Sequence, residues 1–165
     1  MKKLKVYLDT SIINFLYIKD SPDFMQETEV FFNNILAKDK ISAYISNVVI
    51  DEINQTKNVE HRNKLLETFN KYKNIEKLIA EDNIINEIAF LSDNYIKNGI
   101  IPSTKVADSL HIAYSTFFQM DILLSWNFKH LANINKEHKI ITLNRTLGYY
   151  YPFRMANPLE VYFDE

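Results

Sequence analysis

The most informative hydrophobic pattern lies in residues 105–127, KVADSLHIAYSTFFQMDILLSWN. Apolar positions recur there every three to four residues, which predicts a helix. From Val106 to Met120 only Asp108 and, at low pH, His111 carry charge, so we expect this helix to be buried nearly all round. A lone acid in such a helix is costly unless a positive charge lies beside it. The apolar side comprises Val106, Leu110, Ala113, Tyr114 and Phe117, and the opposite side Asp108, His111, Ile112 and Ser115.

Three short apolar runs predict buried strands, and each leads into a polar residue. Residues 4–8 end at Asp9, residues 41–45 at Ser46, and residues 122–126 at Asn127. Helices are predicted between them, together with an edge strand and a final turn in the tail. This alternation predicts an α/β fold, a three-layer α/β/α domain with a short, mainly parallel central sheet. The predicted helices are residues 22–37, 47–55, 58–72, 82–97, 128–134 and 140–147, with a helix or single turn at 12–18 capped by Thr10 or Ser11.

Composition narrows the classes of protein that the chain can represent. The 165 residues are 47% hydrophobic and show no linker or repeat, so we expect one domain over residues 1–165. The net charge of −2 argues against a nucleic-acid coat protein but allows an enzyme that holds phosphates through a metal. The absence of cysteine excludes thiol chemistry and zinc–thiolate sites. Because no apolar run approaches membrane-spanning length and the N-terminus is no signal peptide, we expect a cytoplasmic bacterial protein with no membrane partner.

Acidic and amide side chains follow the predicted strands where each strand ends. Asp9 follows the first strand, Glu52 comes soon after the second, and Asn127 follows the third. Ligands of open parallel sheets bind beyond the carboxyl ends of the strands, so these residues and Asp108 could meet there. Three crowded carboxylates stay ionised only around a cation. An all-oxygen ligand set selects Mg²⁺ or Mn²⁺, and such an ion suits cleavage of a phosphodiester.

Four motifs that carry these residues together resemble the PIN domain, and within it the VapC-type toxins of bacterial type II toxin–antitoxin pairs. The motifs are LDTSI at Asp9, ISNVVIDEI with Ser46 and Glu52, ADSLHIA at Asp108 and LLSWNFKHL at Asn127. Each is weak alone, but the four occur in order along essentially the whole chain. The resemblance implies a Mg²⁺- or Mn²⁺-dependent endoribonuclease that cuts RNA. It also implies a small antitoxin that covers the active-site groove, and a homodimer.

The resemblance assigns a role to each matching residue. Asp9 and Asp108 would be the main direct metal ligands, and Glu52 would bind metal or orient the attacking water. Asn127 stands where many members have a fourth aspartate, so it offers a carbonyl oxygen but one negative charge fewer. Thr10, Ser11 and Ser46 would support the site, whereas Asp121 precedes its strand and is not counted as a ligand.

Each acid also has a purely structural explanation. Asp9 could be a turn or cap residue, and Glu52 a surface acid of its helix. Asp108 could be a first-turn acid favoured by the helix dipole. Only the joint placement of the three at the strand ends favours a functional site.

Other side chains with possible chemistry are weaker candidates. His111 is interpreted as a packing or hydrogen-bonding residue rather than a catalytic one. Lys105 and Lys129 could contact phosphates. Trp126 could stack on a base, although core packing explains it better. The remaining histidines, His61, His130 and His138, are expected at the surface.

The prediction is therefore a metal-dependent ribonuclease, the toxin of a toxin–antitoxin pair. One alternative is a PIN nuclease of RNA processing or DNA cleavage outside any toxin system. Another is a catalytically weak PIN-fold module that binds RNA or protein, which the departure at Asn127 makes plausible.

Overall fold

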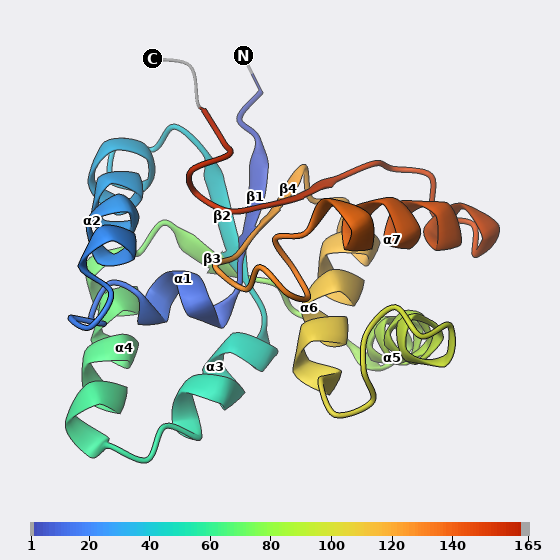
Figure 1. The fold of residues 1–165 in the computed structure, drawn as a ribbon, viewed down its shortest axis with the longest axis horizontal. Coiled ribbons are helices and arrows are strands. Elements are labelled where there is room, and N and C mark those ends of the chain that lie inside the picture. The colour runs from blue at the N-terminus through green and yellow to red at the C-terminus, as the bar shows by residue number, and fades with distance from the viewer. Residues whose placement is uncertain (1, 163–165) are drawn as a thin grey trace.

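Five parallel strands form the central sheet in the order β3-β2-β1-β4-β5 (Figure 1). The computed structural model describes residues 2–162. The central strand β1 and its neighbour β4 are buried along nearly their whole length. Both therefore have a continuous apolar run in the sequence. The strands are β1 (Lys5–Leu8), β2 (Ser42–Ile45), β3 (Ile75–Lys77), β4 (Ile122–Leu124) and β5 (Arg154–Ala156).

Helices cover both faces of this sheet. Figure 1 shows α1, α2 and α4 on one side and α5, α6 and α7 on the other, with α3 near the carboxyl ends of the strands. This arrangement confirms the predicted three-layer α/β/α fold, and the sheet is wholly parallel. The helices are α1 (Thr10–Asn14), α2 (Pro22–Phe31), a π-helical turn η1 (Phe32–Leu36), α3 (Asn47–Asn54), α4 (Val59–Lys71), α5 (Asp82–Lys97), α6 (Val106–Phe117) and α7 (Ile134–Thr146).

The strand order changes direction between β1 and β4. From β1, the strands β2 and β3 are added in turn toward one edge of the sheet. The chain then returns to the other side of β1, where β4 and β5 are added toward the opposite edge. Ligands of such sheets bind at this switch point, beyond the carboxyl ends of the strands. Leu8 of β1 pairs with Leu124 of β4, so the residues that follow them, Asp9 and Ser125, emerge side by side at the switch point.

The central helix α6 is buried from Ser109 to Thr116, except at Leu110. Its first turn is different, because Val106 is exposed and Asp108 is half-buried. The prediction of burial nearly all round is therefore wrong for this turn. Asp108 is therefore partly accessible to solvent.

Several predicted boundaries need correction. Residues 128–132 form turns rather than a helix, and α7 begins at Ile134, where the side chain of Asn133 caps it by accepting the Lys136 N–H at 3.0 Å. α1 is capped by Asp9, not by Thr10 or Ser11, and ends at Asn14. The edge strand β5 in the tail is confirmed, and residue 163 of the predicted tail lies outside the described residues. Within residues 2–162 no helix has the length and apolar character needed to cross a membrane.

Candidate functional site

Asp9 lies at the switch point and is almost completely buried, with 4% of its surface exposed. Its Oδ1 accepts hydrogen bonds from Ser11 Oγ at 2.5 Å and from the Ile12 N–H at 3.3 Å. Its Oδ2 accepts one from Ser125 Oγ at 2.6 Å. A carboxylate oxygen has two lone pairs, so Oδ2 retains one acceptor position. The capping function and a ligand function are therefore compatible in this one side chain.

Ser125 connects Asp9 to the loop that carries Asn127. Its hydroxyl accepts the Asn127 N–H at 2.9 Å while donating to Asp9. Ser11 makes the matching link, because its Oγ accepts the Trp126 N–H at 2.8 Å. Ser125 was not predicted as a site residue, because the predicted strand ran through it to residue 126, whereas β4 ends at Leu124. A serine within the apolar run was the available signal.

Glu52 is held at one end of a chain of hydrogen bonds, which we call the ring because the backbone of α3 closes it. Its Oε1 lies 2.6 Å from Nε2 of His111, whose Nδ1 lies 2.8 Å from the Tyr7 hydroxyl. Tyr7 in turn lies 2.7 Å from Ser46 Oγ. Ser46 caps α3, the helix that carries Glu52, by accepting the Val48 N–H at 3.2 Å. The ring ties β1, β2, α3 and α6 together at one point, so His111 is a hydrogen-bonding residue as interpreted from the sequence.

The two oxygens of Glu52 differ in their surroundings. Oε1 also accepts a hydrogen bond from Thr10 Oγ1 at 2.7 Å, so its lone pairs are both used. Within residues 2–162 no hydrogen bond is made to Oε2, which leaves that oxygen available to a ligand or a water. Burial acts to raise the pKa of Glu52, but the His111 hydrogen bond and charge, with Thr10, outweigh it and lower the pKa. Glu52 is therefore ionised at neutral pH.

Asn127 contacts Asp108 directly. Its Nδ2 donates to Oδ2 of Asp108 at 3.3 Å. Its Oδ1 accepts the backbone N–H groups of Lys129 at 3.2 Å and His130 at 3.1 Å. Two backbone donors require an oxygen at that position, which settles the orientation of the amide. The carbonyl oxygen that the sequence offers as a ligand is thus directed at its own loop, and the amide nitrogen faces Asp108.

The three acids share one histidine neighbour. His111 lies close enough to Asp9, Glu52 and Asp108 for its charge to lower the pKa of each carboxyl group. Burial nevertheless dominates at two of them and raises the pKa of Asp9 and of Asp108 above their ordinary values. Glu52 raises the pKa of Asp108 further. The structure thus gathers three acids around one buried histidine, and the burial of two of them is only partly compensated.

Two of the acids have oxygen atoms that a hard cation could use as ligands. Within residues 2–162 no three His, Cys, Asp or Glu side chains form a group that could hold a metal ion. Mg²⁺ in proteins is commonly held by one or two carboxylates and several waters, so a site does not need three such side chains. Asp9 keeps a free acceptor on Oδ2, and Oδ1 of Asp108 makes no hydrogen bond within the described part of the chain. These two carboxylates fit such an ion chemically.

His130 lies inside the molecule, where the sequence analysis expected a surface residue. Only 5% of it is exposed, and among the described residues its buried Nδ1 has no hydrogen-bond partner. Burial lowers its pKa, and nearby Lys129 and Lys136 lower it further, whereas Asp108 raises it. The expectation was wrong because the turn after Asn127 folds this side chain inward. His61 is half-buried and bonds Asn14 Oδ1 at 2.8 Å.

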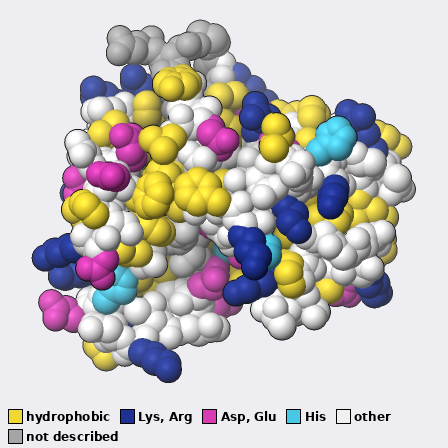
Figure 2. Space-filling view, in the orientation of Figure 1, with side chains coloured by type: hydrophobic (Ala, Val, Ile, Leu, Met, Phe, Trp, Pro, Cys, Tyr) yellow, Lys and Arg dark blue, Asp and Glu magenta, His cyan; other side chains and the backbone are white. Residues whose placement is uncertain are grey.

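The candidate substrate-binding residues occupy different surroundings. Lys105 and Lys129 are exposed, and the charge of Lys105 lowers the pKa of Asp108. Trp126 is 4% exposed and donates from Nε1 to Thr28 Oγ1 at 2.9 Å, a setting typical of core packing. Asp121 accepts the Lys5 N–H at 2.7 Å at the start of β4, at the opposite end of the sheet. Figure 2 shows acidic, basic and histidine side chains around a hollow near the centre of the molecule, beside a hydrophobic area.

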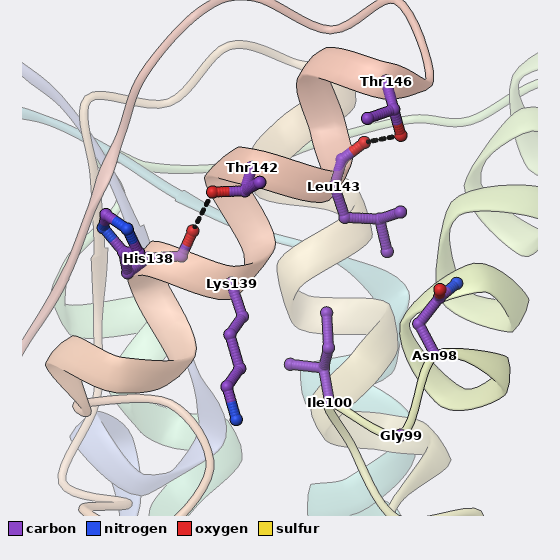
Figure 3. A pocket seen from close by; sticks show the side chains of 8 residues that line it. All are labelled: Asn98, Gly99, Ile100, His138, Lys139, Thr142, Leu143 and Thr146. Carbon is purple, nitrogen blue, oxygen red and sulfur yellow. Dashed lines mark hydrogen bonds between the residues drawn. The ribbon is translucent and has the colours of Figure 1, made fainter.

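A separate depression of about 530 Å³ lies between α7 and the turn after α5 (Figure 3). Its threonines are turned back onto their own helix, because Thr142 donates to the His138 carbonyl and Thr146 to the Leu143 carbonyl. None of the candidate acids lines it. The depression is lined by Asn98, Gly99, Ile100, His138, Lys139, Thr142, Leu143 and Thr146.

Comparisons with known proteins identify the fold. No protein-family model matches the chain, and no curated protein matches it in sequence. Among solved structures it is similar to a chain of "VapBC2 from Rickettsia felis bound to a DNA fragment from their promoter". The TM-score is 0.51 at 18% sequence identity, over 76% of this chain and 90% of the other. At this identity the likeness concerns the fold, and the chain has the predicted PIN-like three-layer α/β/α fold, shared with a VapBC2 chain.

Proposed function

We propose that this protein is a metal-dependent endoribonuclease and the toxin of a type II toxin–antitoxin pair. The observation that carries the proposal is the gathering of Asp9, Glu52 and Asp108 around His111 at the switch point of a PIN-like sheet. Two of these acids are buried without full compensation, which is the electrostatic setting that a cation would relieve. The exposed lysines nearby suit a substrate that carries phosphates.

Mg²⁺ or Mn²⁺ is the cofactor that the residues fit best. Asp9 and Asp108 would be its direct ligands, and the bound ion would supply Lewis acidity toward a phosphodiester and a water of lowered pKa. Glu52 would be held by His111 and Thr10 through its Oε1 and would act on the attacking water rather than bind the ion. Its free Oε2 would orient the attacking water and accept a proton from it.

The other residues of the site act by holding these groups in place. Ser11 and Ser125 fix the Asp9 carboxylate, so that its free lone pair keeps one direction. Asn127 steadies Asp108 through its amide nitrogen. Lys105 and Lys129 would contact phosphates of the RNA strand.

A toxin of this kind would have two protein partners. A VapBC2 chain shares the fold, and that complex is bound to a promoter DNA fragment. By analogy we expect a small antitoxin that covers the site and a cytoplasmic homodimer of this chain. A short open reading frame for a DNA-binding protein beside this gene, whose product co-purifies with the chain, would support the pairing. An isolated gene would favour a nuclease of RNA processing.

A second candidate function is a PIN-fold module that binds RNA with little catalysis. The orientation of Asn127 favours it, because the amide donates to Asp108 where a fourth carboxylate would offer another ligand oxygen. This module would bind single-stranded RNA without cutting it in the presence of Mg²⁺ or Mn²⁺.

Cleavage of a mixed RNA pool by the purified protein distinguishes these functions. We expect cleavage with Mg²⁺ or Mn²⁺ that EDTA stops and that Asp108→Asn abolishes while the protein remains folded. Asp93→Asn, at an exposed acid of α5, is the control and should cut normally. RNA binding without cleavage under either ion would select the binding module, and neither binding nor cleavage would contradict both functions.

A further inference from the structure

An exposed aromatic ring lies directly beside the candidate site. Phe128 follows Asn127, the residue that contacts Asp108, and 47% of its surface is exposed. Single exposed apolar side chains are common on protein surfaces, so it is the position of this ring next to the polar site that is informative. Trp126, the aromatic residue considered from the sequence, is buried, whereas Phe128 is open to a ligand.

Phe128 is the outer member of a cluster of four aromatic rings. Its centroid lies 6.1 Å from that of Trp126 and 5.8 Å from that of Phe24. Phe24 and Trp126 lie 4.7 Å apart, and Phe15, just beyond α1, contacts both. Figure 2 shows hydrophobic side chains gathered along one side of the central hollow. Phe24 and Trp126 pack against Phe128, and about half of Phe128 stays exposed to solvent.

The loop that carries Phe128 is held by its own hydrogen bonds. Asn127 Oδ1 accepts the next two backbone N–H groups after Phe128, and the Asn127 carbonyl accepts the N–H of Ala132 at 2.8 Å. Asn133 Nδ2 donates to the Phe128 carbonyl at 3.1 Å. A ring on a loop fixed in this way loses little conformational freedom when a ligand binds.

The charges beside the ring select the kind of ligand. Lys129 is exposed and follows Phe128 directly, and Lys105 lies near Asp108. A flat ring next to cations suits a nucleotide, whose base stacks on the ring while its phosphate meets the lysine. A purely apolar protein side chain would make no use of these cations.

We propose that Phe128 is a stacking platform for a nucleobase of the RNA strand, beside the phosphate that is cut. The assignment rests on the proposed nuclease function and adds to it a binding residue that determines how the strand is positioned. The ring would bind the base equally before and during the reaction. Its loss should therefore raise KM and leave kcat nearly unchanged.

The test compares Phe128→Leu and Phe128→Trp with the wild type on single-stranded RNA decamers that contain 2-aminopurine. Stacking of a base on an aromatic side chain contributes about 1–3 kcal/mol, equivalent to roughly 5- to 150-fold in affinity. We expect Phe128→Leu to raise KM, and the Kd measured in EDTA, by a factor in this range. The quenching of 2-aminopurine on binding should fall in Phe128→Leu and return in Phe128→Trp.

Phe90→Leu is the matched control, because Phe90 is 46% exposed on α5, away from the site. It should bind and cut as the wild type does. Wild-type KM and quenching in Phe128→Leu, with cleavage intact, would overturn the stacking assignment alone. If Phe128→Leu lost only binding of a partner protein, the ring would be a protein contact and the assignment would be wrong. A wild type that neither binds nor cuts RNA would overturn the nuclease function and the platform together.

Discussion

Two substitutions of His111 separate its link to Glu52 from its link to Tyr7. His111→Gln places an amide near the former Nε2 position and can still donate to Glu52. His111→Asn places its amide near the former Nδ1 position and can reach the Tyr7 hydroxyl but not Glu52. Because the imidazole bonds both residues, at 2.6 Å and 2.8 Å, each variant retains one bond and loses the other.

The expected magnitudes follow from the groups involved. A hydrogen bond to a charged group contributes about 1.5–3 kcal/mol. If the His111 bond holds Glu52 in its reactive orientation, its loss in His111→Asn should lower kcat by about 10- to 150-fold. His111→Gln should stay within about fivefold of the wild type. The free energy of unfolding should fall by about 1.5–3 kcal/mol in His111→Asn, which loses the bond to the charged Glu52, and by about 0.5–1.5 kcal/mol in His111→Gln, which loses the bond to Tyr7.

Steady-state cleavage and urea unfolding measured on the same preparations provide the assay. A positioning role for His111 predicts that both variants are folded in the absence of urea, that their KM values are similar, and that kcat is much lower in His111→Asn than in His111→Gln. Equal kcat values in the two variants would refute the reasoning, because His111 would then act only through stability. The same conclusion would follow if kcat decreased only in proportion to the fraction of unfolded protein.

Two further predictions concern charge in the site. Asn127→Asp replaces the amide that donates to Asp108 with a second carboxylate. We expect tighter Mn²⁺ binding by calorimetry and lower stability in EDTA. Unchanged values for both would mean that residue 127 does not act on the site. Burial raises the pKa of Asp9 above its unfolded value, so its contribution to stability without metal is lost as the pH rises through the folded-state pKa. In EDTA, Asp9→Asn should therefore unfold at higher urea than the wild type at pH 8, with a difference that shrinks toward pH 4. A constant difference across this range would show that the ionisation of Asp9 is not what destabilises the apo protein.

The sequence predicted best the elements whose pattern is local and strong. The predicted bounds 82–97 match α5, because an amphipathic period ends there at Gly99, whose φ of 69° favours glycine after a helix. The acids at the strand ends were likewise visible, since a polar residue after a buried apolar run stands out. The sequence could not show that β1 and β4 are neighbours, because this depends on the order of the strands in the sheet.

Other features depend on contacts that no local pattern reveals. β3 has three residues, Ile75–Lys77, of which two are exposed, so no apolar run marks it. The start of α7 was placed too late because residues 135–139 are all polar. The inward turn of His130 and the orientation of Asn127 both depend on one loop, whose backbone N–H groups select the Asn127 oxygen.

The most direct measurement is a Mn²⁺ titration of the apo protein, followed by electron paramagnetic resonance of the free ion. A site ligated by Asp9 and Asp108 predicts saturable binding that is lost in Asp9→Asn and in Asp108→Asn. Glu52→Gln should retain binding, because Glu52 would lie outside direct coordination and the amide still offers an oxygen, yet it should lose RNA cleavage. Asp93→Asn should behave as the wild type. Mn²⁺ binding that is unchanged in Asp9→Asn and Asp108→Asn would contradict the site.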